Sequence, residues 1–186
     1  MDILEKAVAF ATEAHAGKSR KGSGLPYILH PIEVVVIISA MSRDPELMAA
    51  GALHDVPEDT KITLEEIRAE FGGRVARLVK SNTEDKRPDL PAEVTWQQRK
   101  EETVNYLCME ATYDEKVLVL ADKLSNLRGM YHDLQFTDAE EYWKRFNQSD
   151  PKEHCWYHSA ILASTAELSE FDEWQEYREL IRKVFG

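Results

Sequence analysis

The sequence is poor in cysteine and in long apolar runs, and each shortage excludes a class of protein. Its two cysteines, Cys108 and Cys155, stand far apart and neither has a CxxC neighbour. A disulfide framework or a thiolate zinc site is therefore not expected, and we predict two reduced thiols that fill space. The longest apolar stretch, residues 34–41, has the length of a core segment and is too short to cross a bilayer.

Basic residues are also in short supply. The chain has 23 Lys and Arg residues and 34 Asp and Glu residues, which gives a net charge of −11. This balance argues against a surface for nucleic-acid polymers, because binding a polyphosphate backbone relies on many Lys and Arg contacts. A small anionic ligand remains compatible where a local cationic cluster or a metal offsets the repulsion. Residues 1–6 carry acids where a signal peptide has bases, so we expect a cytoplasmic protein with no membrane partner.

What the sequence has in abundance is helical periodicity. Apolar residues recur every three to four positions along almost the whole chain. Capping-box patterns at 63–66, 95–98 and 137–140, and the pair Asp150-Pro151, mark helix starts. No segment alternates with a period of two for long enough to predict a strand. We therefore predict an all-α fold of roughly eight to ten helices, in a single domain that spans residues 1–186.

Two stretches have the composition of loops, residues 17–26 and residues 82–93. The first contains Lys18, Arg20 and Lys21. Charge patterning alone favours a solvated loop for this cluster.

An imidazole and three carboxylates fall within six residues, at His54-Asp55 and Glu58-Asp59. On one continuous helix these four side chains would share a broad face. If that face is buried, a divalent cation is the natural compensator for the charge, whereas the alternative is a solvated acidic helix end. Pro57 lies between the two pairs and is expected to end or kink the helix there.

Asp122 interrupts the apolar run 117–127, which we expect to be a buried helix, and Asn126 stands one turn further along the same face. The ordinary partners for this carboxylate, Lys123 and Arg128, are expected to point elsewhere on the helix. His30 is another candidate partner, because Pro31 can begin a helix and hold the imidazole at its entrance. Two imidazoles and two carboxylates form a mixed nitrogen and oxygen set that suits Mn²⁺, Fe²⁺ or Zn²⁺.

Four separated motifs carry a resemblance to a known family. His30, His54-Asp55 and Asp122 follow the order of the H…HD…D signature of HD phosphohydrolases. The sequence segments around them, at 15–18, 26–31, 54–60 and 120–128, resemble the motifs of RelA/SpoT-type hydrolase domains. The resemblance covers residues 1 to about 135, with the motifs in 15–128, and we expect the C-terminal helices of 137–186 to pack on this domain.

This resemblance implies roles for individual residues. In the family, two histidines and two aspartates hold one metal, usually Mn²⁺, which makes His30, His54, Asp55 and Asp122 the ligands here. The neighbouring acidic pair, Glu58 and Asp59, would orient and deprotonate the attacking water. The basic loop contacts the nucleotide in the family, so the implied substrate contacts are Lys18, Arg20 and Lys21, with Asn126 at the ribose or at a water.

Arg99 and Lys100 are further candidates for substrate binding, because they supply positive charge from the next predicted helix. An equally plausible interpretation is a solvated helix face with ion pairs to Glu101 and Glu102.

The implied reaction removes the 3′-pyrophosphate of ppGpp or pppGpp and yields GDP or GTP with pyrophosphate. In size the chain resembles the stand-alone small hydrolases of the family. One alternative is an HD-type phosphatase that acts on another nucleotide or a phosphorylated dinucleotide cofactor. Another is a nucleotide-binding module without turnover, although binding alone does not require the Glu58-Asp59 pair. The expected partner is thus a small nucleotide, and the sequence indicates no oligomeric state.

Overall fold

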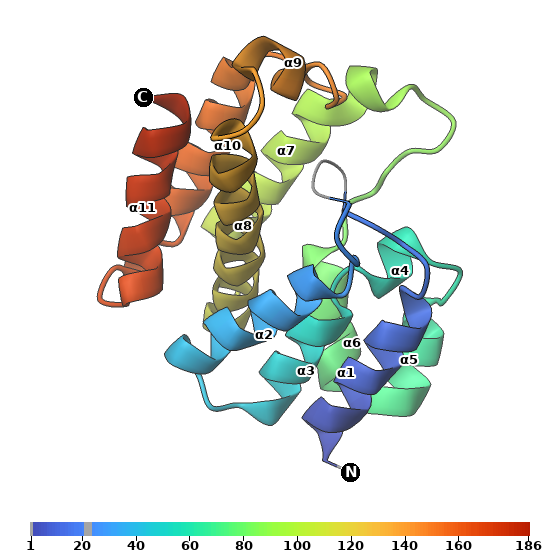
Figure 1. The fold of residues 1–186 in the computed structure, drawn as a ribbon. Coiled ribbons are helices and arrows are strands. Elements are labelled where there is room, and N and C mark those ends of the chain that lie inside the picture. The colour runs from blue at the N-terminus through green and yellow to red at the C-terminus, as the bar shows by residue number, and fades with distance from the viewer. Residues whose placement is uncertain (1, 21–23) are drawn as a thin grey trace. The chain divides into compact units, whose positions relative to one another are not determined.

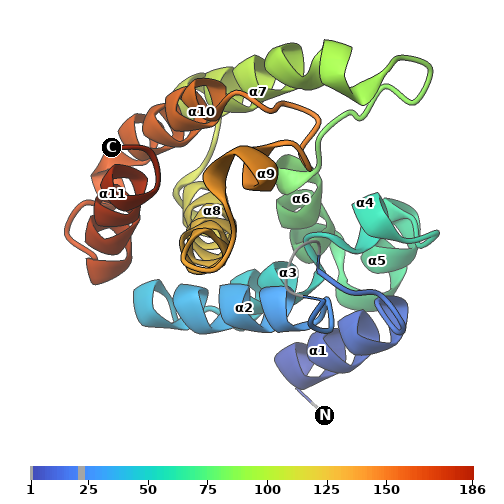
Figure 2. The same cartoon turned by 45° about the horizontal axis from the view of Figure 1, so that its top comes forward.

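The computed structural model describes residues 2–20 and 24–186 (Figures 1 and 2). The described residues form helices, joined by loops in which one isolated bridge links Ser19 and Pro26. The prediction of an all-α fold is confirmed. The helices group into two compact units. The first runs to Thr83 and resumes over Thr112–Ser125, and the second comprises Glu84–Ala111 and Asn126–Gly186.

The first unit is built around one short central helix, α3. Its helices are α1 (Ile3–Ala14), α2 (Leu29–Met41), α3 (Pro45–Leu53), α4 (Val56–Asp59), α5 (Leu64–Phe71), α6 (Gly73–Asn82) and the part of α8 (Tyr113–Leu134) up to Ser125. The helix α3 packs against α1, α2 and α6, and α5 packs against α6. Fully buried aliphatic side chains, among them Ile38, Leu47 and Leu118, form the core of this unit.

A shared arginine ties three helices of the first unit together. Arg74 of α6 bonds Asp44 at the start of α3 and Asp114 at the start of α8, each at 2.7 Å. It also pairs with Glu46 of α3 at 2.8 Å. These charge-assisted bonds fix the N-terminal ends of α3 and α8 relative to α6.

The second unit has an aromatic core. Its helices are α7 (Ala92–Met109), the remainder of α8, α9 (Ala139–Trp143), α10 (Pro151–Ser164), the 3₁₀ helix η1 (Ala166–Leu168) and α11 (Asp172–Phe185). The helix α10 runs beside α7 and α11 in both views (Figures 1 and 2). Tyr142, Trp143, Tyr157 and Tyr177 are buried here.

The predicted helix starts can be compared with the observed caps. Thr63 forms the expected capping box with Glu66, and Asp150 caps α10 ahead of Pro151. The cap at Thr95 is wrong: α7 already begins at Ala92, and the hydroxyl of Thr95 donates to the carbonyl of Ala92 inside the helix. Near residue 137 the cap is Asp138. The carboxylate of Asp138, rather than the hydroxyl of the predicted Thr137, accepts from the backbone amides of Glu140 and Glu141.

A predicted helical segment and a predicted loop are both found in the structure. Residues 117–120 lie within α8, and residues 83–91 form the loop between α6 and α7, as expected. Cys108 and Cys155 are free thiols. Within the described ranges no helix is both long and apolar enough to span a membrane. The cytoplasmic location, and the packing of residues 137–186 into one domain with the rest, stay predictions.

Candidate metal centre

The site begins at a break between two helices. In a continuous helix the amide of residue 57 would bond the carbonyl of Leu53, but Pro57 has no amide hydrogen. Accordingly α3 ends at Leu53 and α4 starts at Val56, which leaves His54 as the C-cap of one helix and Asp55 as the N-cap of the next. The break expected at Pro57 is confirmed. The single helical face considered for all four side chains is wrong, because only Glu58 and Asp59 lie on α4.

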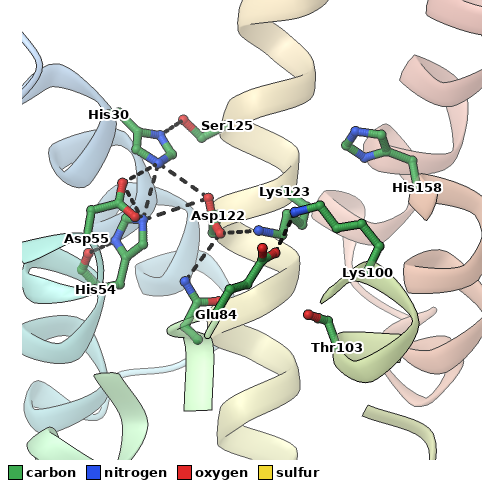
Figure 3. Close-up of polar contacts among 12 residues, drawn as sticks. His30, His54, Asp55, Glu84, Lys100, Thr103, Asp122, Lys123, Ser125 and His158 are labelled. Atoms are coloured by element: carbon green, nitrogen blue, oxygen red, sulfur yellow. Dashed lines mark hydrogen bonds and ion pairs between the residues drawn. The ribbon is translucent and has the colours of Figure 1, made fainter. Parts of the chain in front are cut away.

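Four side chains from three places in the first unit point toward one another (Figure 3). His30 comes from the first turn of α2, and its Nε2 lies 3.2 Å from Nε2 of His54. Asp122 comes from α8, and its Oδ1 lies 3.3 Å from Nε2 of His30 and 3.7 Å from Nε2 of His54. Oδ2 of Asp55 lies 3.1 Å from the His54 nitrogen and 3.5 Å from the His30 nitrogen. The structure thus brings together all four residues predicted as ligands.

Hydrogen bonds on the far side of each imidazole determine which ring nitrogen carries the proton. The carbonyl of Gly51 can only accept, so Nδ1 of His54, 2.8 Å away, donates to it. The hydroxyl of Ser125 donates to Oε2 of Glu33 at 2.6 Å, so it accepts from Nδ1 of His30 at 2.8 Å. In the neutral form both rings therefore carry the proton on Nδ1. Both Nε2 lone pairs face the carboxylates of Asp55 and Asp122, as in a metal-ligating histidine.

This donor set fits a divalent cation. His30, His54 and Asp122 are buried, and each offers one ligand atom within 4.8 Å of the others. Two imidazole lone pairs and two carboxylates repel one another unless a positive charge lies between them. Burial alone would lower the pKa of His54, but the charges of Asp55 and Asp122 outweigh it and raise that pKa to about 9. The same electrostatics favour a cation at this point.

The second oxygen of Asp122 is held by two neighbouring side chains. Oδ2 accepts from Nζ of Lys123 at 2.7 Å and from the side-chain amide of Asn82 at 3.3 Å. The expectation that Lys123 points elsewhere is therefore wrong, because a lysine stem is long enough to fold back onto the preceding residue. Burial raises the pKa of Asp122, but Lys123 and the two histidines hold it well below its usual range. Arg128 bonds Glu176 instead.

The other predicted site residues of this region are half-buried where the structure describes them. Glu58 and Asp59 are half-buried on α4, directly after the ligand pair. Lys18 and Arg20 are half-buried in the segment that precedes α2, and Lys21 lies outside the described residues. Asn126, also half-buried, follows Asp122 by four residues on α8.

In the second unit, Arg99 and Lys100 have a partner that neither interpretation of the sequence named. Nη1 of Arg99 bonds Oε2 of Glu84 at 2.7 Å. Nζ of Lys100 bonds the other carboxylate oxygen of Glu84 at 2.5 Å (Figure 3). Nζ of Lys100 also lies 4.7 Å from the centre of the Tyr157 ring. The expected ion pairs with Glu101 and Glu102 are wrong. Glu101 accepts from Gln97 instead, and Glu102 accepts from Arg87 and Gln98.

Sequence reasoning missed Ser125, Lys123 and Tyr27 as supporting residues. Ser125 offered a weak signal, because a serine one turn from Asp122 within an apolar run needs a hydrogen-bond partner. The hydroxyl of Tyr27 donates to Oδ2 of Asp55 at 2.6 Å, a contact that no local pattern reveals.

Comparison with known proteins gives a family match over most of the chain. A protein-family model described as an HD domain matches residues 7–145. The chain is 33% identical over 130 residues to a guanosine-3′,5′-bis(diphosphate) 3′-pyrophosphohydrolase of Aquifex aeolicus, and 34% identical over 134 residues to a GTP pyrophosphokinase of Myxococcus xanthus. These matches cover 69% and 71% of this chain but 18% of each relative. The chain thus spans under a fifth of the length of these curated relatives.

Two solved structures share the fold. One, described as a metazoan ortholog of SpoT that hydrolyzes ppGpp and plays a role in starvation responses, superposes with a TM-score of 0.79. It is 24% identical, and the match covers 98% of this chain and 96% of that one. The other, a crystal structure of a Listeria monocytogenes EGD-e protein, has a TM-score of 0.73 at 34% identity and covers 88% of this chain and 100% of the other.

Proposed function

This chain belongs to the HD-domain family, and on that premise we propose that it is a metal-dependent pyrophosphohydrolase that removes the 3′-pyrophosphate of ppGpp and pppGpp. The observation that carries the proposal is that the side chains of His30, His54, Asp55 and Asp122 converge. An acidic pair on α4 follows two of them directly in the chain. The name of the Aquifex relative supports the choice of substrate. The match to the metazoan ppGpp hydrolase supports the fold.

We propose Mn²⁺ as the ion, held by the four ligating side chains. When bound, a divalent ion supplies a Lewis acid that offsets the charge of the phosphoryl oxygens. The carboxylates of Glu58 and Asp59 would orient the attacking water and accept its proton at a carboxylate oxygen. The proposed contacts to the nucleotide are Lys18, Arg20, Lys21, Asn126, Arg99 and Lys100. For the last two, substrate binding requires competition with Glu84, which bonds both cations.

A turnover assay on a substrate panel tests the proposal. The protein is loaded with Mn²⁺ and offered ppGpp, pppGpp, nucleoside 3′-phosphates and a 2′-phosphorylated dinucleotide, with pyrophosphate and phosphate quantified separately. We expect pyrophosphate and GDP from ppGpp. Release of phosphate from another nucleotide, without turnover of ppGpp, would favour the related phosphatase. Tight nucleotide binding without any product would favour a binding module.

Glu58→Gln tests the assignment of the acidic pair, because it keeps the shape of the side chain and removes the base. We expect the variant to retain its metal while kcat falls by roughly 10². Glu65→Gln, on the exposed side of α5, is the matched control and should behave as the wild type. If kcat of Glu58→Gln is normal, Glu58 is not the base and another group activates the water.

A further inference from the structure

Tyr27 is held in place beside the metal centre by contacts on both its backbone and its ring. Its amide donates to the carbonyl of Lys18 at 2.9 Å, and its carbonyl accepts from the amide of His30 at 3.0 Å. The centre of its ring lies 4.7 Å from that of His15, and the rings of Tyr27 and His30 meet edge to face with 6.2 Å between their centroids. The position of the phenol is therefore fixed before any ligand binds.

His15 contributes to this arrangement through its ring. It is 3% exposed, and neither ring nitrogen has a hydrogen-bond partner among the described residues. Its nitrogens therefore bond no protein group there, and its ring packs against that of Tyr27.

The hydroxyl of Tyr27 reaches the two acidic groups that the proposed reaction uses. It donates at 2.6 Å to Oδ2 of Asp55, the same oxygen that lies 3.1 Å from Nε2 of His54. The carboxylate of Asp59 also acts on this hydroxyl: burial raises the pKa of Tyr27 first, and Asp55 and then Asp59 raise it further. A phenol carries one proton, so it can donate to only one of these carboxylates at a time.

We propose that Tyr27 is a positioning residue that aims the Asp55 carboxylate at the metal and couples this ligand to Asp59. The inference rests on the metal site and the activity proposed above. A carboxylate oxygen has lone pairs for both a phenol proton and a cation, so the bond fixes the orientation of Asp55 without blocking its ligation. The proton given to Asp55 is withheld from Asp59, which preserves Asp59 as an acceptor for the proton of the water.

Tyr27→Phe removes the hydroxyl and keeps both ring contacts. We expect its dissociation constant for Mn²⁺, measured by equilibrium dialysis in the absence of nucleotide, to rise by roughly tenfold or more, the scale for losing a hydrogen-bond partner of a ligand. In turnover, kcat at saturating Mn²⁺ should fall while KM for the nucleotide stays unchanged. Tyr113→Phe, which removes an exposed tyrosine hydroxyl at the start of α8, is the matched control and should match the wild type.

A double-mutant cycle separates positioning from general support of the fold. If Tyr27 acts through Asp55, Tyr27→Phe should cost little further metal affinity in an Asp55→Asn background. An undiminished tenfold loss in that background, or wild-type affinity in the single variant with its melting temperature preserved, would overturn the proposal. A wild-type protein that binds Mn²⁺ without hydrolysing ppGpp would defeat the proposed function, while the metal measurements would still decide the role of Tyr27.

Discussion

Replacement of Ser125 by alanine should weaken metal binding although Ser125 is not a ligand. The residue is fully buried on α8, where its hydroxyl accepts from Nδ1 of His30 and donates to Glu33. Ser125→Ala leaves the Nδ1 proton buried without an acceptor, at a cost of about 1–3 kcal/mol. The ring can avoid this cost by moving the proton to Nε2, which lies 3.3 Å from Oδ1 of Asp122 and can donate there. In that tautomer Nε2 has no lone pair for a metal.

The size of the effect follows from this competition between tautomers. Loss of an outer hydrogen-bond partner typically weakens metal affinity by roughly 10- to 100-fold, and each factor of ten corresponds to about 1.4 kcal/mol. The expected tenfold loss or more is therefore within the cost of one unsatisfied buried donor. The carboxylate of Glu33, which loses the proton of the serine, adds to the disturbance.

Equilibrium dialysis against Mn²⁺, followed by elemental analysis, measures the loss directly. Thermal unfolding of the apoprotein shows whether the fold survives. The matched control is Ser39→Ala, which removes a hydroxyl that donates to a backbone carbonyl within α2, away from the ligands. If Ser125→Ala binds Mn²⁺ as tightly as the wild type, then Ser125 does not set the tautomer of His30, and the assignment of the Nδ1 proton is wrong.

Two further predictions concern stability. A Cβ atom at Gly51 would lie 2.5 Å from Cδ1 of the buried Ile38. Gly51→Ala should therefore lower the free energy of unfolding by about 1–3 kcal/mol and the melting temperature by several degrees. Gly73→Ala is the control and should leave the melting temperature unchanged, because a Cβ atom there has no contact under 3.7 Å. Burial, with help from Lys100, lowers the pKa of His154. The unfolded chain then binds the proton more readily, so stability falls as the pH drops below 6.5. His154→Gln should flatten this slope in urea unfolding from pH 7 to about 5, and an equal effect of exposed His132→Gln would contradict the assignment.

The sequence predicted what depends on neighbours along the chain and missed what depends on distant partners. Thr63 and Asp150 were recognisable as caps because a cap bonds amides two or three residues away. The four residues that converge at the candidate metal centre could be proposed from the order of motifs. In contrast, the pairing of Arg99 with Glu84 spans a loop, and the bond from Ser125 to Glu33 joins residues 92 positions apart. Such partners are chosen by tertiary packing, which local patterns do not encode.

The same packing explains why metal affinity and folding should be coupled in the first unit. The proposed ligands come from the start of α2, from the junction of α3 with α4, and from α8, so no single helix contains the site. Their separations are set by how α2 packs on α3 and by the charge network of Arg74, which holds the starts of α3 and α8. A cation that binds the folded arrangement more tightly than the unfolded chain raises the melting temperature by mass action. Core variants that shift α2 relative to α3 should therefore weaken the metal site without touching a ligand, because the distances between His30 and His54 are a property of the helix packing.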